Sequence, residues 1–243
     1  IMMYLIKAEL YKFKKDISVC IISFGLICCT SITVFTGAYS NAENAVLNLG
    51  KDSMVLILAC AIYVEFSCTD DFTNRTVIYA ITYGNRRFQI LLAKYCRYIV
   101  GCTIIIISYM TVSMIISFLV LETEMVLPHL FLYAARSLLL SLPLYWVIAT
   151  IFFFFAIITR KSSMAMGISI AGSIIGVVFT NKAYFSMQQP NNSLLRFSPI
   201  IQIPMIYEQT LSTCDYISAI IISIVTIIII LLVSSVIFNK AEL

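Results

Sequence analysis

Few side chains in this sequence have the types and spacing that chemistry needs. The chain has one histidine, His129, next to Pro128, so it offers no second histidine for a metal site and no base beside a serine or cysteine nucleophile. A GxxxxGK segment followed by Ser or Thr, which would cradle the phosphates of ATP, is also missing. We therefore predict no catalytic residue, no metal ligand and no bound cofactor, and we expect His129 to be an ordinary surface residue.

The composition explains why such residues are scarce. Of the 243 residues, 61% are apolar and only 12% are charged, and the mean hydropathy is +0.99. Globular domains are close to half apolar and a quarter charged, so this chain could not cover a water-facing surface. These values exclude a cytosolic enzyme, a nucleic-acid-binding domain and a secreted disulfide scaffold. We predict an all-α polytopic membrane protein.

Six stretches are long and apolar enough to cross a membrane. A hydrocarbon core of about 30 Å takes about 20 apolar residues in a helix, and continuous apolar runs favour helices over barrel strands. The predicted spans are Ile17–Tyr39, Ser53–Thr69, Ile99–Leu121, Leu130–Thr159, Ser162–Thr180 and Tyr216–Phe238. We expect one transmembrane domain over residues 1–243, divided into a start (1–16), spans one and two (17–69), a loop (70–98), spans three to five (99–180), an outer segment (181–215) and the last span with its tail (216–243).

The lysines and arginines predict the orientation. Cytoplasmic loops are enriched in these residues, and an N-terminus inside the cell places 12 of the 16 on the cytoplasmic side. Those residues are Lys7, Lys12, Lys14, Lys15, Arg75, Arg86, Arg87, Lys94, Arg97, Arg160, Lys161 and Lys240. We therefore expect both termini in the cytoplasm. Because the first apolar run has full spanning length, we also expect a retained signal-anchor helix.

One acidic side chain, Glu65, falls clearly within a predicted span, about one turn from its inner end. Acids inside the hydrocarbon are costly and often functional, but the cost falls near the interface, where water or an arginine is within reach. Two roles stay open for Glu65: a structural tether, which its depth favours, and a proton or substrate site.

The segments at the two faces also carry patterns. In residues 2–16, Met3, Ile6, Leu10 and Phe13 recur at spacings of 3, 4 and 3, which predicts an amphipathic helix on the inner membrane face. This helix is either a basic anchor or an elbow that positions the bundle.

Residues 181–215 hold apolar pieces too short to span, divided by prolines, and we expect short re-entrant or interfacial helices there.

The loop 70–98 is the longest cytoplasmic segment. Asp70 or Asp71 can cap a helix start, and no breaker occurs until Gly84, so we expect a helix that ends at Tyr83. Asn85 would then cap a second helix, from Arg86 to Arg97, that runs into the third span. A short helix held beneath the membrane by two spans can transmit force from a soluble partner. The alternative is a solvated connector whose charges lie among the headgroups.

In this loop the sequence resembles the permease subunits of type-2 ATP-binding-cassette (ABC) exporters. Their pattern is an acid followed after four residues by threonine, then a basic pair, then a lysine before the next span. Here the matching residues are Asp71 and Thr76, then Arg86 and Arg87, then Lys94. The family usually has glycine at the position of Arg75. The six spans, the amphipathic start, the outer segment and the short basic tail extend the resemblance over nearly the whole chain.

The resemblance implies partners that the sequence alone does not show. Such permeases pair with a second permease chain, identical or paralogous, and a separate ATPase subunit, which binds ATP and Mg²⁺, docks on the loop helix. Carried over, the ATPase contact comprises Asp71, Phe72, Thr73, Asn74, Arg75, Thr76, Tyr79 and Tyr83. Arg86, Arg87 and Lys94 would support the loop or bind anionic headgroups. The chain itself would not be an enzyme.

The resemblance also suggests a substrate. Small permeases of this kind are similar to those that confer immunity to lantibiotics and other bacteriocins in the bacterial cytoplasmic membrane. The outer segments carry slightly more acids than bases, which would attract a cationic peptide. A drug or lipid-linked substrate stays open, and so does a non-transporting membrane sensor or assembly factor of a peptide system.

Overall fold

The computed structural model describes residues 2–36, 41, 45, 53–69, 76–121, 127–159, 161–186, 198–207 and 213–240. These residues form helices and no strand, as predicted from the continuous apolar runs. In chain order the elements are α1 (Met2–Lys15), α2 (Ser18–Phe35), α4 (Ser53–Val64), the π-helix η1 (Glu65–Thr69), α6 (Thr76–Thr82), α7 (Arg87–Val120), α8 (Leu127–Thr159), α9 (Ser162–Ser186), α10 (Pro199–Tyr207) and α11 (Thr213–Lys240).

Four of the described helices are long and apolar enough to cross a membrane. The qualifying stretches are Ser18–Phe35 in α2, Arg87–Val120 in α7, Phe131–Thr159 in α8 and Asp215–Asn239 in α11. Two further apolar stretches, Met54–Thr69 and Ser163–Gly176, are shorter. They coincide with the second and fifth predicted spans. The structure therefore agrees with a helical membrane protein, and the six-span topology stays a prediction.

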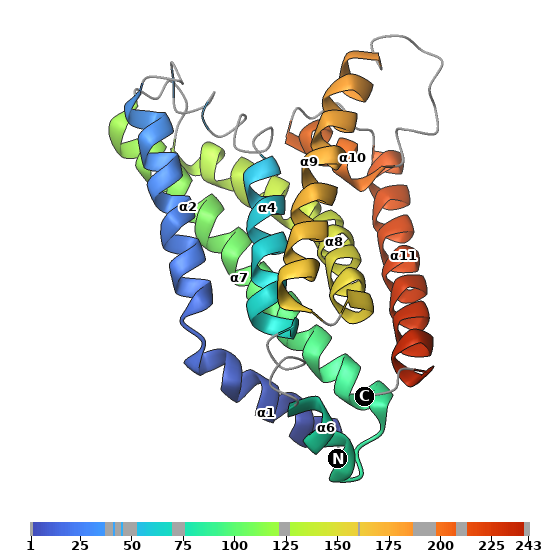
Figure 1. Ribbon diagram of the computed structural model, residues 1–243. Coiled ribbons are helices and arrows are strands. Elements are labelled where there is room, and N and C mark those ends of the chain that lie inside the picture. The colour runs from blue at the N-terminus through green and yellow to red at the C-terminus, as the bar shows by residue number, and fades with distance from the viewer. Residues whose placement is uncertain are drawn as a thin grey trace.

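The long helices stand side by side in one bundle, with α1 bent away across one end (Figure 1). That end also holds α6, the start of α7 and the end of α11, whereas α10 lies toward the opposite end (Figure 1). We call it the basic end, because α1 and the start of α7 supply it with Lys7, Lys12, Lys14, Lys15, Arg86 and Arg87. The termini of the described chain thus lie at the same end, as the sequence predicts.

The longest helix, α7, joins most of the bundle. It has 34 residues and is therefore about 50 Å long, well beyond the 30 Å or so of a hydrocarbon core. The second loop helix and the third span predicted from the sequence are thus one continuous helix. Its neighbours are α1, α2, α4, α6, α8, α11 and η1. A displacement of α7 would be felt by every one of these elements.

An aromatic stack fixes α7 at the centre of the bundle. The ring of Tyr98 lies 5.8 Å from that of Tyr63 in α4 and 6.1 Å from that of Phe153 in α8, measured between centroids. Its hydroxyl donates to the carbonyl of Cys60 at 3.0 Å, which satisfies it in the core. Gly101 lies beneath Tyr63, and a Cβ at that position would collide with the tyrosine ring. The missing side chain is what allows α4 and α7 to approach so closely.

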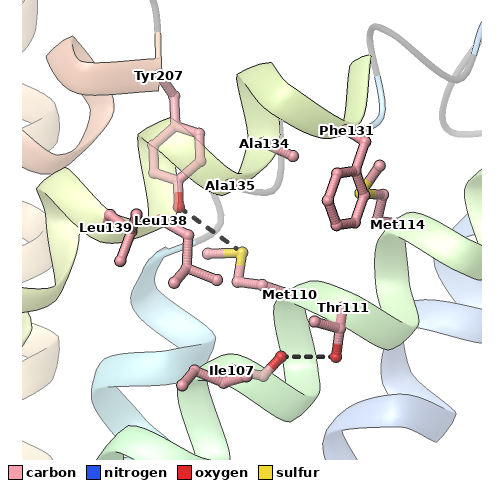
Figure 2. Close-up of a pocket in the computed structure, with 10 residues that line it drawn as sticks. All are labelled: Ile107, Met110, Thr111, Met114, Phe131, Ala134, Ala135, Leu138, Leu139 and Tyr207. Carbon is pink, nitrogen blue, oxygen red and sulfur yellow. Dashed lines mark hydrogen bonds between the residues drawn. The ribbon is translucent and has the colours of Figure 1, made fainter. Parts of the chain in front are cut away.

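An apolar pocket of about 280 Å³ lies between α7, α8 and α10 (Figure 2). The hydroxyl of Tyr207 donates to the sulfur of Met110 at 3.7 Å across one wall, and Phe131 and Met114 lie together at another. Burial raises the pKa of Tyr207 to about 12, although the hydrogen bond with Ser141 opposes the shift, so the phenol stays protonated at physiological pH. The pocket can therefore receive an apolar group, and the hydroxyls in its lining belong to Tyr207 and Thr111.

The predicted outer segment is described in part. Its second apolar piece forms α10, a helix of nine residues that packs on α8 and α9 and is too short to span. The hydroxyl of Tyr133 in α8 donates to the carbonyl of Tyr207 at the end of α10. The first piece, residues 193–197, lies outside the described residues.

Candidate functional site

The short helix α6 has one face toward the bundle and one away from it. Val77 is buried in the core, and Ala80 and Ile81 pack against that core. Thr76, Tyr79 and Tyr83 follow at spacings of 3 and 4, and all are exposed, Tyr79 by 64% and Tyr83 by 86%. Tyr79 in α6 and Tyr83, directly after its last residue, form an exposed surface suited to protein contact, because tyrosine is enriched at interfaces.

The turn after α6 is closed by backbone and side-chain hydrogen bonds. Gly84 has a φ of +83°, which favours glycine, and its N–H donates to the carbonyl of Ile81 at 2.9 Å. The amide of Asn85 donates to the carbonyl of Ala80, also at 2.9 Å. The predicted stop at Gly84 is confirmed. The prediction that Asn85 caps the next helix is wrong: its side chain bonds back to α6, and the residue before α7, Arg86, makes no side-chain cap.

Arg87, the first residue of α7, attaches the start of α7 to the end of α11. Its guanidinium donates to the carbonyls of Asn239 at 2.8 Å and Phe238 at 3.4 Å. Carbonyls in the last turn of a helix lack intrahelical partners, and a cation there also complements the helix dipole. Arg87 is therefore a C-terminal cap for α11, a role the sequence did not reveal. Arg86 is exposed.

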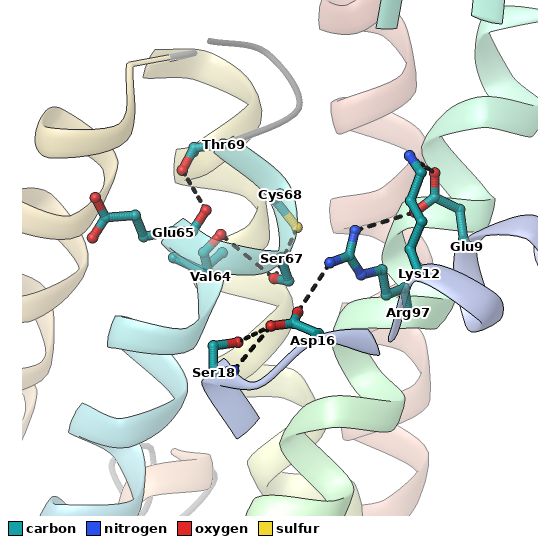
Figure 3. A network of polar contacts seen from close by, with 10 residues as sticks. All are labelled: Glu9, Lys12, Asp16, Ser18, Val64, Glu65, Ser67, Cys68, Thr69 and Arg97. Carbon is teal, nitrogen blue, oxygen red and sulfur yellow. Dashed lines mark hydrogen bonds and ion pairs between the residues drawn. The ribbon is translucent and has the colours of Figure 1, made fainter. Parts of the chain in front are cut away.

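The same helix carries two buried cations, Lys94 and Arg97. Lys94 faces the protein interior, at a depth where a lysine needs a hydrogen-bonding or charged partner. Arg97, one turn further along α7, lies among carboxylates of α1 and of the connection to α2 (Figure 3). Lys94 was predicted from the resemblance as a loop support or headgroup contact; Arg97 was placed only as a cytoplasmic cation.

Arg97 is the centre of a buried ion cluster. Its guanidinium lies 3.0 Å from Asp16 Oδ2 and 3.4 Å from Glu9 Oε2, and Lys12 Nζ lies 3.1 Å from Glu9 Oε1 (Figure 3). The side chains of Arg97, Glu9 and Asp16 are 9, 12 and 13% exposed, whereas that of Lys12 is 46% exposed. Charges this buried are held by their partners, because removing one leaves the others desolvated and unpaired.

Asp16 forms the elbow between α1 and α2. One carboxylate oxygen binds Arg97, and the other accepts the N–H of Ser18 at 3.0 Å and its hydroxyl at 2.5 Å (Figure 3). Ser18 is the first residue of α2, so this carboxylate satisfies one of the free N–H groups of that helix. A single side chain thus ties the first predicted span, the amphipathic helix and α7 together.

The ion cluster changes the interpretation of α1. The predicted helix is present, but the face that meets the bundle combines Ile6 and Phe13 with the buried Glu9. Met3 and Leu10, which the apolar stripe also contained, are exposed. Of the two roles left open, the elbow that positions the bundle fits these contacts better than a basic anchor alone, because the helix is fixed to α7 by charge.

Glu65 begins the π-helix η1, at the end of α4. The hydroxyl of Thr69 donates to the Glu65 carbonyl at 2.7 Å, and Ser67, Cys68 and Thr69 are buried. The Glu65 side chain points away from Arg97 and the ion cluster (Figure 3). Short π-helices are frequent at functional sites. The geometry separates Glu65 from the α1–α7 contact, and its two possible roles both stay predictions.

The first five residues of the predicted ATPase contact, Asp71, Phe72, Thr73, Asn74 and Arg75, lie outside the described residues. No protein-family model matches this chain, and no match was found among curated proteins. The site is therefore defined by its geometry and by the loop pattern in the sequence. The structure brings Thr76, Tyr79 and Tyr83 onto one face, places Arg87 on α11 and buries Lys94 in the bundle.

Proposed function

We propose that this chain is the permease subunit of an ATP-driven type-2 ABC exporter in a bacterial cytoplasmic membrane. It works with a second permease chain, and ATP and Mg²⁺ are bound by a separate ATPase subunit. The observation that carries the proposal is the exposed face of α6, where Thr76, Tyr79 and Tyr83 stand away from the bundle while Val77 fixes the helix to the core.

The connections of α6 support a coupling role. The tight turn at Gly84 leads straight into α7, so α6 cannot move far without its neighbour. Arg87 ties this start to α11, and Arg97 ties the next turns to α1 and α2. A force applied to α6 would therefore act on three of the four helices that are long enough to span, rather than on one loop.

The pocket of Figure 2 supports an amphipathic substrate. Met110, Thr111 and Met114 of α7 line it, so the helix that receives α6 at one end forms a pocket wall toward the other. We assign the apolar part of the substrate to this pocket. With the slightly acidic outer segments, the substrate that fits best is a cationic antimicrobial peptide, and the biological role is immunity or resistance to it.

The proposal is tested in the native host. A strain that lacks this chain is complemented with the wild-type chain, with the double variant Tyr79→Ala/Tyr83→Ala, or with Phe35→Ala as a control. Phe35 is an exposed aromatic of α2 at the end of the bundle away from α6. Growth inhibition by a panel of cationic antimicrobial peptides is measured, together with the ATPase that co-purifies with each chain.

We expect deletion to sensitise the cell to at least one peptide. The wild type and Phe35→Ala should restore resistance, whereas the double variant should reach the membrane and lose both resistance and its ATPase. Unchanged sensitivity of the deletion strain to the whole panel would contradict the peptide substrate. A double variant that matches the wild type in both measurements would contradict the coupling role of α6.

A further inference from the structure

A groove of about 650 Å³ runs between α8 and α11 at the end of the bundle opposite the basic end. Ala135 and Leu139 of α8 and Ile217 and Ile220 of α11 form its apolar walls, and Arg136 and Tyr216 also line it. Its volume is in the range of pockets that hold small ligands. It adjoins the pocket of Figure 2, with which it shares Ala135 and Leu139, but that pocket extends toward α7 and α10 instead of α11.

Arg136 is the residue of this groove that indicates a bound ligand. The side chain is exposed, and it makes no hydrogen bond and no ion pair with any residue in the described part of the chain. Arg87 and Arg97, in contrast, bind carbonyls or carboxylates. An exposed guanidinium beside apolar walls at a membrane surface attracts negatively charged headgroups.

Helix lengths give the depth of Arg136 in the membrane. Counting about 20 residues, or 30 Å, back from the end of α8 at Thr159 reaches Leu139. The same count back from Asn239 in α11 reaches Ala219. Arg136 and Tyr216 each lie three residues beyond these points, at the level of the headgroups, while Leu139 and Ile220 lie at the level of the acyl chains.

We propose that this groove is a binding site for one anionic phospholipid from the leaflet at that end of the bundle. The Arg136 guanidinium binds the phosphate of the headgroup, because hydrogen bonds between a guanidinium and a phosphate are strengthened by charge. The apolar walls hold an acyl chain. Charge and depth argue for this occupant together, because Arg136, which has no partner in the described part of the chain, lies at the level where a lipid carries its negative charge. The site does not depend on the exporter function.

The test compares lipids retained by the full-length chain. Protein is reconstituted in nanodiscs with equal amounts of phosphatidylglycerol and phosphatidylcholine, and bound lipids are counted by native mass spectrometry. Arg136→Gln removes the charge, and Arg136→Lys keeps it. Lys161→Gln is the matched control, since it removes one exposed cation at the opposite membrane face. Ile220→Trp fills the groove, and Ile224→Trp places the same residue one turn away, outside it.

We expect the wild type to retain one phosphatidylglycerol in preference to phosphatidylcholine. Arg136→Gln should lower that retention about fivefold or more, the factor expected for one basic residue at a charged headgroup, and Ile220→Trp should lower it with the charge intact. Arg136→Lys, Lys161→Gln and Ile224→Trp should resemble the wild type. Circular dichroism checks that each variant is folded.

Three results would overturn the proposal. One is equal retention of the two lipids by the wild type. Another is a loss in Lys161→Gln or Ile224→Trp as large as that in Arg136→Gln or Ile220→Trp, since the effect would then be nonspecific. The third is a result in which Arg136→Gln retains as much phosphatidylglycerol as the wild type but forms fewer dimers of the chain. A second copy of the chain would then be the occupant of the groove.

Discussion

Arg97 binds two carboxylates that are 81 and 88 residues away in the sequence. Because the three side chains are almost out of contact with solvent, their attraction is little screened, and their positions are fixed by one another rather than by water. The apolar contacts of α1 hold the helix against the bundle but do not fix the angle between α1 and α7, because they are not directional. The ion cluster fixes the orientation of α1 relative to α7. Because Asp16 also binds Ser18, it fixes the start of α2 as well.

The variant Arg97→Met tests this cluster. It leaves Glu9 and Asp16 buried without a cation, so we expect a loss of about 3–5 kcal/mol in stability and a fall in melting temperature of about 10 °C in detergent. Lys12→Met is the control. The Lys12 side chain is half exposed, so its ion pair with Glu9 contributes no more than about 1 kcal/mol. A melting temperature for Arg97→Met within about 2 °C of the wild type would contradict a structural role for the cluster.

At the scale of elements, the sequence predicts the helices better than their contacts. The apolar runs predict the long helices, and Gly84 predicts the end of α6. Both features are predictable because they depend on residues close together in the sequence. The burial of Glu9 and Asp16 has no local signal in the sequence, since their partner Arg97 is 88 and 81 residues away. Asn85 was misassigned because two helix ends compete for its side chain, and the Ala80 carbonyl wins. The π-helix at Glu65 has no hydropathy signature.

The packing of α4 on α7 makes a separate prediction. Gly101→Ala places a methyl group within the Tyr63 ring, so we expect a loss of about 1–3 kcal/mol from overpacking. Gly25→Ala in α2 is the control: nothing lies within 4 Å of the added Cβ, and alanine is the better helix former. The thermal stability of both variants is compared in the same detergent.

A second substitution, at Tyr63, tests whether the clash with its ring causes the loss of stability in Gly101→Ala. Tyr63→Leu shortens the side chain at the contact, and in the double variant with Gly101→Ala it should recover part of the lost stability. If Gly101→Ala is as stable as Gly25→Ala, or if Tyr63→Leu and Gly101→Ala lose stability additively, then close approach at this glycine is not what fixes α4 against α7.

At the scale of the whole molecule, the two ends have different properties. The basic end carries the exposed face of α6 and the attachments made by Arg87 and Arg97. The opposite end carries two adjoining apolar hollows against α8, one toward α7 and α10 and one toward α11. Of the described helices, α7 reaches from the turn at Gly84 to the pocket at Met110. Under the proposed function, the exposed face of α6 would receive the ATPase, α7 would connect that face to the pocket, and the pocket would hold the substrate.

The most direct test of this account is site-specific photo-crosslinking from α6 in the native host. Benzoylphenylalanine replaces Tyr83 in the full-length chain, and the same substitution at Phe35 is the control, since both side chains are largely exposed but lie at opposite ends of the bundle. Adducts are identified by peptide sequencing. We predict that the Tyr83 probe captures an ATPase with a phosphate-binding loop and that the Phe35 probe does not. Export activity retained by a chain whose Tyr83 probe never captures such an ATPase would contradict the account.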